Sequence, residues 1–154
     1  VLIVPGGGIF ADFVRREDKN DDDSHFDAIS AMDRYGRFLS TFGLPVVQMP
    51  IIPKYCSAVF LPHKYFMKYD PLPHSWDVTS DSIAAWTASK LCASLILVKS
   101  VDAEFSKDLK DTDIVDPYIF TIAEKSEIDV KIVNGRRADE LKMALQEYIK
   151  ATRL

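Results

Sequence analysis

Apolar positions along this chain follow two spacings, one typical of strands and the other of helices. Short continuous apolar runs predict strands at residues 1–4, 46–49, 58–61, 95–98 and 130–133. Between them, apolar residues recur three or four positions apart, which is typical of amphipathic helices. These predicted helices cover residues 9–17, 24–42, 79–91, 116–125 and 137–150. The stretch 62–76 contains three prolines and is expected to be irregular.

Strands that alternate with helices favour right-handed crossovers, a mostly parallel sheet and helices on both faces. The sequence therefore predicts an α/β fold, a three-layer αβα sandwich with a mostly parallel central sheet. The chain has 154 residues, of which 47% are hydrophobic, and this is enough for one core. We expect a single domain spanning residues 1–154.

The net charge, the lengths of the apolar runs and the cysteine content each argue against a class of protein or site. The net charge of −4 argues against a protein that binds nucleic acid by neutralising phosphates. No apolar run approaches the roughly 20 residues needed to span a bilayer, so we expect a soluble, cytoplasmic protein with no membrane partner. The two cysteines, Cys56 and Cys92, have no CxxC partner, so a cysteine zinc site is not expected and the thiols are expected to be reduced.

In a doubly wound sheet, ligands bind beyond the carboxyl ends of the strands. The first such loop holds Gly6, Gly7 and Gly8, whose backbone N–H groups can approach an anion at the start of a helix. These glycines match neither the P-loop nor the dinucleotide pattern, and a simple flexible turn is the alternative. Two further loops of this kind are 99–102 and Asn134-Gly135, which are weaker signals.

The run Ser75–Ser82 places small polar and acidic residues at the start of a predicted helix. In a purely structural interpretation, Thr79 or Ser80 caps the helix and Asp81 complements its dipole. In the functional interpretation, Asp77 or Asp81 orients cationic groups or holds polar groups of a substrate. The sequence alone leaves both interpretations open.

The three histidines have no i, i+4 spacing, and we expect them to be unliganded. The acidic run Asp21–Asp23 is expected to be a solvated loop. The sequence therefore predicts no protein-bound metal site.

Four segments, residues 1–12, 28–36, 72–84 and 132–135, together carry a family resemblance. They resemble archaeal kinases of the amino acid kinase superfamily, and within it the (5-(aminomethyl)furan-3-yl)methyl phosphate kinases of methanofuran biosynthesis. The resemblance extends to uridylate kinase, whose acceptor is also a phosphate. The segment Ser75–Ala84 is far more specific than the glycine triplet.

The resemblance implies transfer of the ATP γ-phosphoryl group to the phosphate of an aminomethylfuran, with Mg²⁺ as the metal cofactor. It assigns Gly6, Gly7 and Gly8, with Asp77 and Thr79, to the acceptor. Asp81 takes the position of the family aspartate that organises catalytic lysines. The nucleotide is assigned to Lys99, Ser100 and Asp102. The family usually pairs, so the resemblance also implies a homodimer or higher homo-oligomer.

The sequence departs from the family pattern at several places. It contains no Lys-x-Gly-Gly-Ser strand, so we expect the first strand of the fold to be missing and this chain alone to show little or no kinase activity. Lys99 and Ala103 replace the usual Thr and Gly. One alternative is a kinase for another acceptor, such as isopentenyl phosphate, a nucleoside monophosphate or an amino acid. The other is an inactive relative that binds a small ligand.

Overall fold

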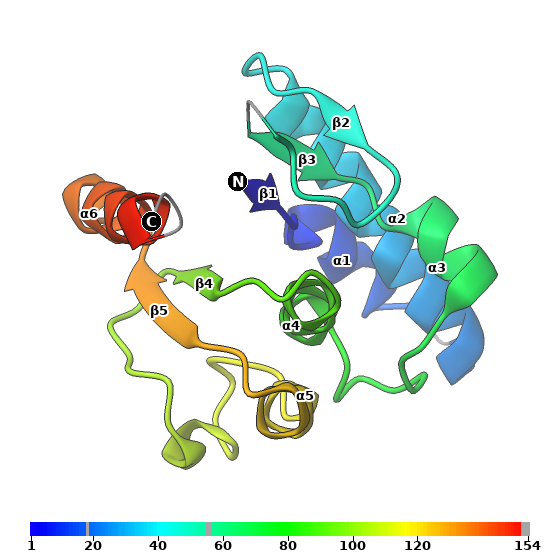
Figure 1. Ribbon diagram of the computed structural model, residues 1–154. Helices are drawn as coiled ribbons and strands as arrows, with labels where there is room; N and C mark the ends of the chain where they lie inside the picture. The colour runs from blue at the N-terminus through cyan, green and yellow to red at the C-terminus, as the bar shows by residue number, and fades with distance from the viewer. Residues whose placement is uncertain (18, 55–56, 152–154) are drawn as a thin grey trace.

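The computed structural model describes residues 1–17, 19–54 and 57–151, and its elements alternate between short strands and helices (Figure 1). The strands are β1 (Leu2–Ile3), β2 (Val46–Val47), β3 (Ala58–Phe60), β4 (Leu95–Lys99) and β5 (Val130–Asn134). The helices are α1 (Gly8–Val14), α2 (Asp21–Ser40), α3 (His63–Tyr69), α4 (Ser80–Lys90), α5 (Tyr118–Ser126) and α6 (Ala138–Ala151), with a 3₁₀ turn η1 at Lys107–Leu109.

All strand pairs in the described part of the chain are parallel, which confirms the predicted α/β class. The strands form two small sheets in place of one central sheet. One has the order β1-β3-β2, and the other joins β4 to β5 with Leu95 opposite Val130 and Lys99 opposite Asn134. Because β4 and β5 are in register to their last residues, their carboxyl ends lie side by side.

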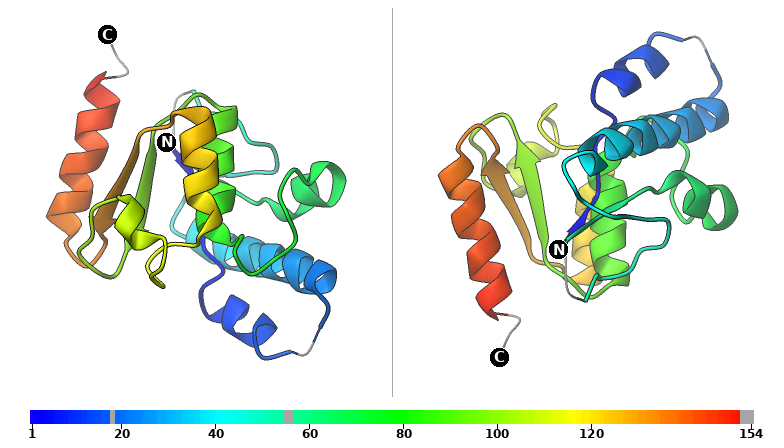
Figure 2. Two further views of the ribbon diagram at one scale, coloured as in Figure 1. Left: turned by 90° about the horizontal axis from the view of Figure 1, so that it is seen from below. Right: turned by 90° about the horizontal axis from the view of Figure 1, so that it is seen from above.

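Helices cover the sheets in layers. Two views show the β4–β5 pair between α6 on one side and α4 with α5 on the other (Figure 2). Helix α2 packs on β3 and β2, and α4 packs on both β4 and α5. The most completely buried side chains come from both halves of the chain and include Ile29, Phe60, Phe66, Ile83 and Ile119. One continuous core therefore joins the two sheets through α4.

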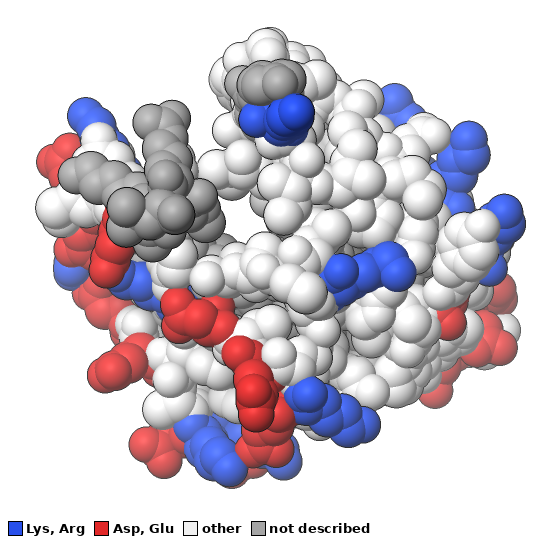
Figure 3. All heavy atoms as spheres, viewed as in Figure 1, with Lys and Arg blue, Asp and Glu red and all other residues white. Residues whose placement is uncertain are grey.

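Charged side chains are mixed on the face that Figure 3 displays. Among the described residues drawn there, Lys and Arg are interspersed with Asp and Glu and form no single basic surface. None of the helices in the described ranges has the length and apolarity required to cross a membrane.

The prediction that residues 62–76 are irregular was wrong for residues 63–69, which form α3. This helix buries Tyr65 and Phe66, and the later prolines of the stretch fall beyond its end. The expectation that Asp21–Asp23 is a solvated loop was also wrong, because these residues form the first turn of α2. The helix begins at Asp21, where the side chain of Asn20 accepts a hydrogen bond from Asp23 N–H at 2.8 Å. Asp18 lies outside the described residues.

Candidate functional site

A bidentate ion pair links the first turn of α4 to the last residue of β4. Lys99 Nζ lies 2.8 Å from Oδ1 and 2.6 Å from Oδ2 of Asp81. The Asp81 residue is only 8% exposed, whereas the Lys99 side chain is 23% exposed. Burial raises the pKa of Asp81, and the ammonium of Lys99 opposes that rise. The structure therefore brings together the predicted catalytic aspartate and a predicted nucleotide-binding lysine.

A second buried carboxylate, that of Asp116, organises the same end of α4. It accepts hydrogen bonds from the backbone N–H and hydroxyl of Thr79, both at 2.9 Å, and from the backbone N–H of Ser82 at 3.0 Å. The Ser82 hydroxyl also donates to it. Asp116 N–H in turn donates to Asp81 at 3.2 Å. Of the two predicted cap residues, Thr79 or Ser80, the structure has Thr79 at the N-cap, but its hydroxyl binds Asp116 and makes no cap hydrogen bond.

The glycine turn lies against this end of α4. A Cβ placed on Gly6 would lie 3.6 Å from Ser80 Oγ, so the Gly6 backbone lies beside the Ser80 side chain. Gly8 has φ +52°, and a Cβ there would meet the ring of Tyr35 at 3.2 Å. Glycine is therefore required at position 8 for both conformation and space. The predicted phosphate loop and the polar run Ser75–Ser82 thus meet in the folded chain.

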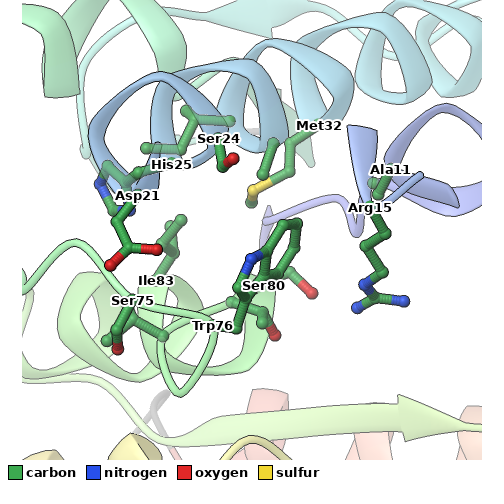
Figure 4. A pocket seen from close by; sticks show the side chains of 15 residues that line it. Ala11, Arg15, Asp21, Ser24, His25, Met32, Ser75, Trp76, Ser80 and Ile83 are labelled. Carbon is green, nitrogen blue, oxygen red and sulfur yellow. The ribbon is translucent and has the colours of Figure 1, made fainter. Parts of the chain in front are cut away.

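A pocket opens between α1, α2, the loop before α4 and the start of α4 (Figure 4). Gly7, Thr79 and Ser80 line it, whereas Asp77 and Asp81 are not among its lining residues. Its enclosed volume is about 60 Å³, which holds a few water molecules.

Two charged residues that the sequence did not single out as site residues line the same pocket. In Figure 4 the carboxylate of Asp21 and the guanidinium of Arg15 lie at opposite ends, with the Trp76 ring between them. The Arg15 guanidinium carbon is 5.7 Å from the centroid of the Trp76 ring. The pocket therefore offers a cation, an aromatic face and an anion in that order.

The other predicted nucleotide residues lie on the surface beyond β4. Ser100 and Asp102 are exposed. Asp102 accepts from Arg137 Nη2 at 2.6 Å and from Asn134 Nδ2 at 3.0 Å, so it joins the end of β5 and not the Asp81–Lys99 pair. Asp77 is exposed, and its backbone carbonyl accepts from Tyr118 N–H at 3.2 Å.

Of the predicted nucleotide residues, Lys99 carries its ammonium at the end of β4, where both oxygens of Asp81 pair with it. The described residues do not provide a ready set of ligands for Mg²⁺ there. Each nearby carboxylate already has partners: Asp81 pairs with Lys99, Asp116 accepts from Thr79 and Ser82, and Asp102 pairs with Arg137. Mg²⁺ at this site would be held mainly by phosphate oxygens of the nucleotide.

Cys92 is exposed and has a free thiol, and Cys56 lies outside the described residues. Sequence reasoning missed Asp116, Arg15 and the pairing of histidines described below. The contacts of Asp116 with Ser82, of Arg15 with Trp76 and of His25 with Asp70 join residues 34 or more positions apart, so a local pattern carries no signal for them. Only Asp70 and His74, four positions apart, are close in the chain.

No family model matches the chain. A [5-(aminomethyl)furan-3-yl]methyl phosphate kinase from Methanocaldococcus jannaschii is 28% identical over 165 residues, which cover 92% of this chain and 76% of that protein. This extent of identity supports a related phosphotransferase, a kinase whose acceptor carries a phosphate group.

Proposed function

We propose that this protein transfers the γ-phosphoryl group of ATP to (5-(aminomethyl)furan-3-yl)methyl phosphate, giving the diphosphate, as a step of methanofuran biosynthesis. The likeness to the Methanocaldococcus jannaschii kinase over 92% of the chain carries this proposal. The Asp81–Lys99 ion pair and the glycine turn support it, because both lie at the start of α4 and offer a cation and backbone N–H groups that suit phosphate.

The charges of the pocket match the chemistry of this acceptor. The acceptor has a cationic amine at one end, an anionic phosphate at the other and an aromatic ring between them. Asp21 suits the amine, the face of Trp76 suits the ring and Arg15 suits the phosphate. Because the enclosed volume is about 60 Å³, we expect Trp76, which is 42% exposed, to move when the ring enters.

In the proposed reaction, Gly6, Gly7 and Gly8 position the acceptor's phosphate beside the start of α4. An oxygen of that phosphate attacks the γ-phosphorus of ATP, the new P–O bond forms, the bond to the β-phosphate oxygen breaks and ADP leaves. Lys99, held by Asp81, neutralises charge on the transferred group, and Mg²⁺ supplies further charge neutralisation when bound with the nucleotide. Positioning and charge neutralisation carry most of the rate in such transfers.

A ³¹P NMR assay tests the proposal on the protein expressed from its complete gene. With ATP, Mg²⁺ and the aminomethylfuran phosphate, we expect ADP and two coupled diphosphate resonances to appear together. Parallel reactions with isopentenyl phosphate, uridine monophosphate and an amino acid identify a different acceptor. ADP formation with one of those and none with the furan would overturn the proposed substrate.

A ligand-binding role without catalysis is the second candidate, which the replacements at Lys99 and Ala103 favour. Binding of the aminomethylfuran phosphate by calorimetry, with no ADP formed over many hours, would establish that role and exclude the kinase.

A further inference from the structure

Two histidines and an aspartate converge where the start of α2 meets the loop after α3. The Nε2 atoms of His25 and His74 each lie 2.9 Å from the same oxygen, Oδ2 of Asp70. One ligand atom from each residue can be chosen so that all three lie within 4.8 Å of one another. The His25 side chain is 3% exposed and that of Asp70 is 12% exposed. The cluster is therefore largely shielded from solvent and brings two nitrogens and one oxygen to one point.

The orientation of the histidine rings is held by further contacts. The rings of His25 and His74 stack, with centroids 4.3 Å apart and planes 17° apart. The other nitrogen of His74, Nδ1, lies 2.6 Å from Oδ1 of Asp22. A histidine that binds a metal through one ring nitrogen usually donates the other N–H to a carboxylate, which fixes its tautomer. The Asp22 contact leaves Nε2 of His74 as the nitrogen able to bind a metal.

We propose that His25, Asp70 and His74 form a Zn²⁺ site, with water in the fourth position. Ligand atoms about 2.1 Å from a tetrahedral metal lie about 3.4 Å apart. The two nitrogen–oxygen separations are 2.9 Å and all three ligand atoms lie within 4.8 Å, so the stacked rings of His25 and His74 would tilt for both nitrogens to point at one ion. Two imidazoles and one carboxylate favour zinc over magnesium or calcium, which prefer oxygen ligands. The charges of Asp70 and Asp22 balance those of the ion, and binding releases the ring protons shared with Asp70.

The site has a structural consequence for the pocket. Ser75 and Trp76 follow His74 directly and line the pocket, as does His25. Zn²⁺ would fix the loop that carries them against α2, and so set the position of the Trp76 ring. The cluster would bind Zn²⁺ whichever acceptor the protein uses, because its ligand atoms come from His25, Asp70 and His74 alone.

Calorimetric titration of the chelator-treated full chain with ZnCl₂ tests the site. We expect one Zn²⁺ per chain, with binding lost in His25→Gln and in His74→Gln. The third histidine gives a matched control, because His63 lies outside the cluster, and His63→Gln should bind as the parent does. Asp22→Asn, which removes only the outer carboxylate, should bind about 10-fold more weakly.

A second measurement uses the unaltered protein, so its result does not depend on whether the variants fold. In the unaltered protein, ¹⁵N NMR of the histidine rings should show Nε2 of His25 and His74 shifting on Zn²⁺ addition, while the ring of His63 stays unchanged. Absence of saturable Zn²⁺ binding, or equal shifts of all three rings, would overturn the proposal and leave the cluster as a hydrogen-bonded network only.

Discussion

Lys99 Nζ lies within 2.8 Å of both carboxylate oxygens of Asp81, and this ion pair links the end of β4 to the start of α4. Asp81 is also hydrogen-bonded by the backbone N–H of Asp116, so one carboxylate receives a cation and an amide donor. Helix α4 packs on both β4 and α5, so the pair lies where the sheet of β4 and β5 meets the helices that cover it. Its removal should therefore affect both stability and the proposed catalysis.

Lys99→Met should destabilise the protein by about 3 kcal/mol, because it leaves the buried Asp81 carboxylate without its cation. The double variant Lys99→Met with Asp81→Asn should recover part of this loss, since neither charge then remains. Urea denaturation of the two single variants and of the double variant measures the coupling free energy between Lys99 and Asp81. Lys107→Met is a control, because its pair with Glu124 is fully exposed, and its midpoint should stay near that of the parent. Equal effects at positions 99 and 107 would contradict the structural role of the pair.

Asp116→Asn should loosen the start of α4, because an amide cannot accept from all the donors that now meet the carboxylate. We expect a loss of about 2 kcal/mol in the free energy of unfolding. Faster hydrogen exchange should appear at the amides of Thr79 and Ser82, which donate to Asp116. Asp113→Asn is the control, since Asp113 is exposed on the same loop. Unchanged protection at both amides would show that another group holds this turn.

Trp76 should report acceptor binding by its fluorescence. It lines the pocket and is 42% exposed, so a ring placed against it would shield it from water. We expect a saturable change on titration with the aminomethylfuran phosphate, lost in Trp76→Phe. The change should persist in Trp86→Phe, because Trp86 packs against Phe66 and Tyr65 away from the pocket lining. The opposite pattern would place the acceptor elsewhere.

Asp21→Asn should weaken binding of the aminomethyl acceptor about 10-fold, which corresponds to loss of a charge-assisted hydrogen bond near the surface. The variant should not alter binding of the analogue in which a hydroxymethyl group replaces the aminomethyl group, because that analogue carries no cation. Asp23→Asn is the matched control, since Asp23 lies in the same turn of α2 and does not line the pocket. Equal weakening for both ligands would mean that Asp21 does not meet the amine.

Tyr148 should titrate abnormally at high pH. Partial burial and the hydrogen bond to Asp129 raise its pKa to about 12, which favours the neutral phenol in the folded state. Its contribution to stability is therefore present below pH 10 and is lost as the pH rises through about 12. Absorbance at 295 nm should show one tyrosine that ionises only at high pH. This ionisation should be absent in Tyr148→Phe and should occur at a lower pH in Asp129→Asn. A normal titration in the parent would disprove the contact.

The hydrophobic pattern by itself determined the α/β class, the positions of the strands and the long helices that follow them. It succeeded because these features depend on side chains a few positions apart, as in the aliphatic run 95–98 and the periodic stretch 79–91. It also narrowed the helix cap to Thr79 or Ser80, since that depends on the local change from loop to helix, and the structure has Thr79 there. The hydrophobic pattern did not predict the helix at 63–69, because the prolines nearby were a stronger local signal than two buried aromatic residues.

Tertiary structure alone decided which polar groups meet. The sequence placed Lys99 and Asp102 in one loop, yet folding pairs Lys99 with Asp81 and Asp102 with Arg137. Folding likewise brings His25 beside Asp70, which lies 45 residues away in the chain. Such contacts depend on how α2, α4 and the strands pack against one another, because a charged or polar side chain becomes buried only where the packed core leaves it a partner. Local patterns contain no information about that partner.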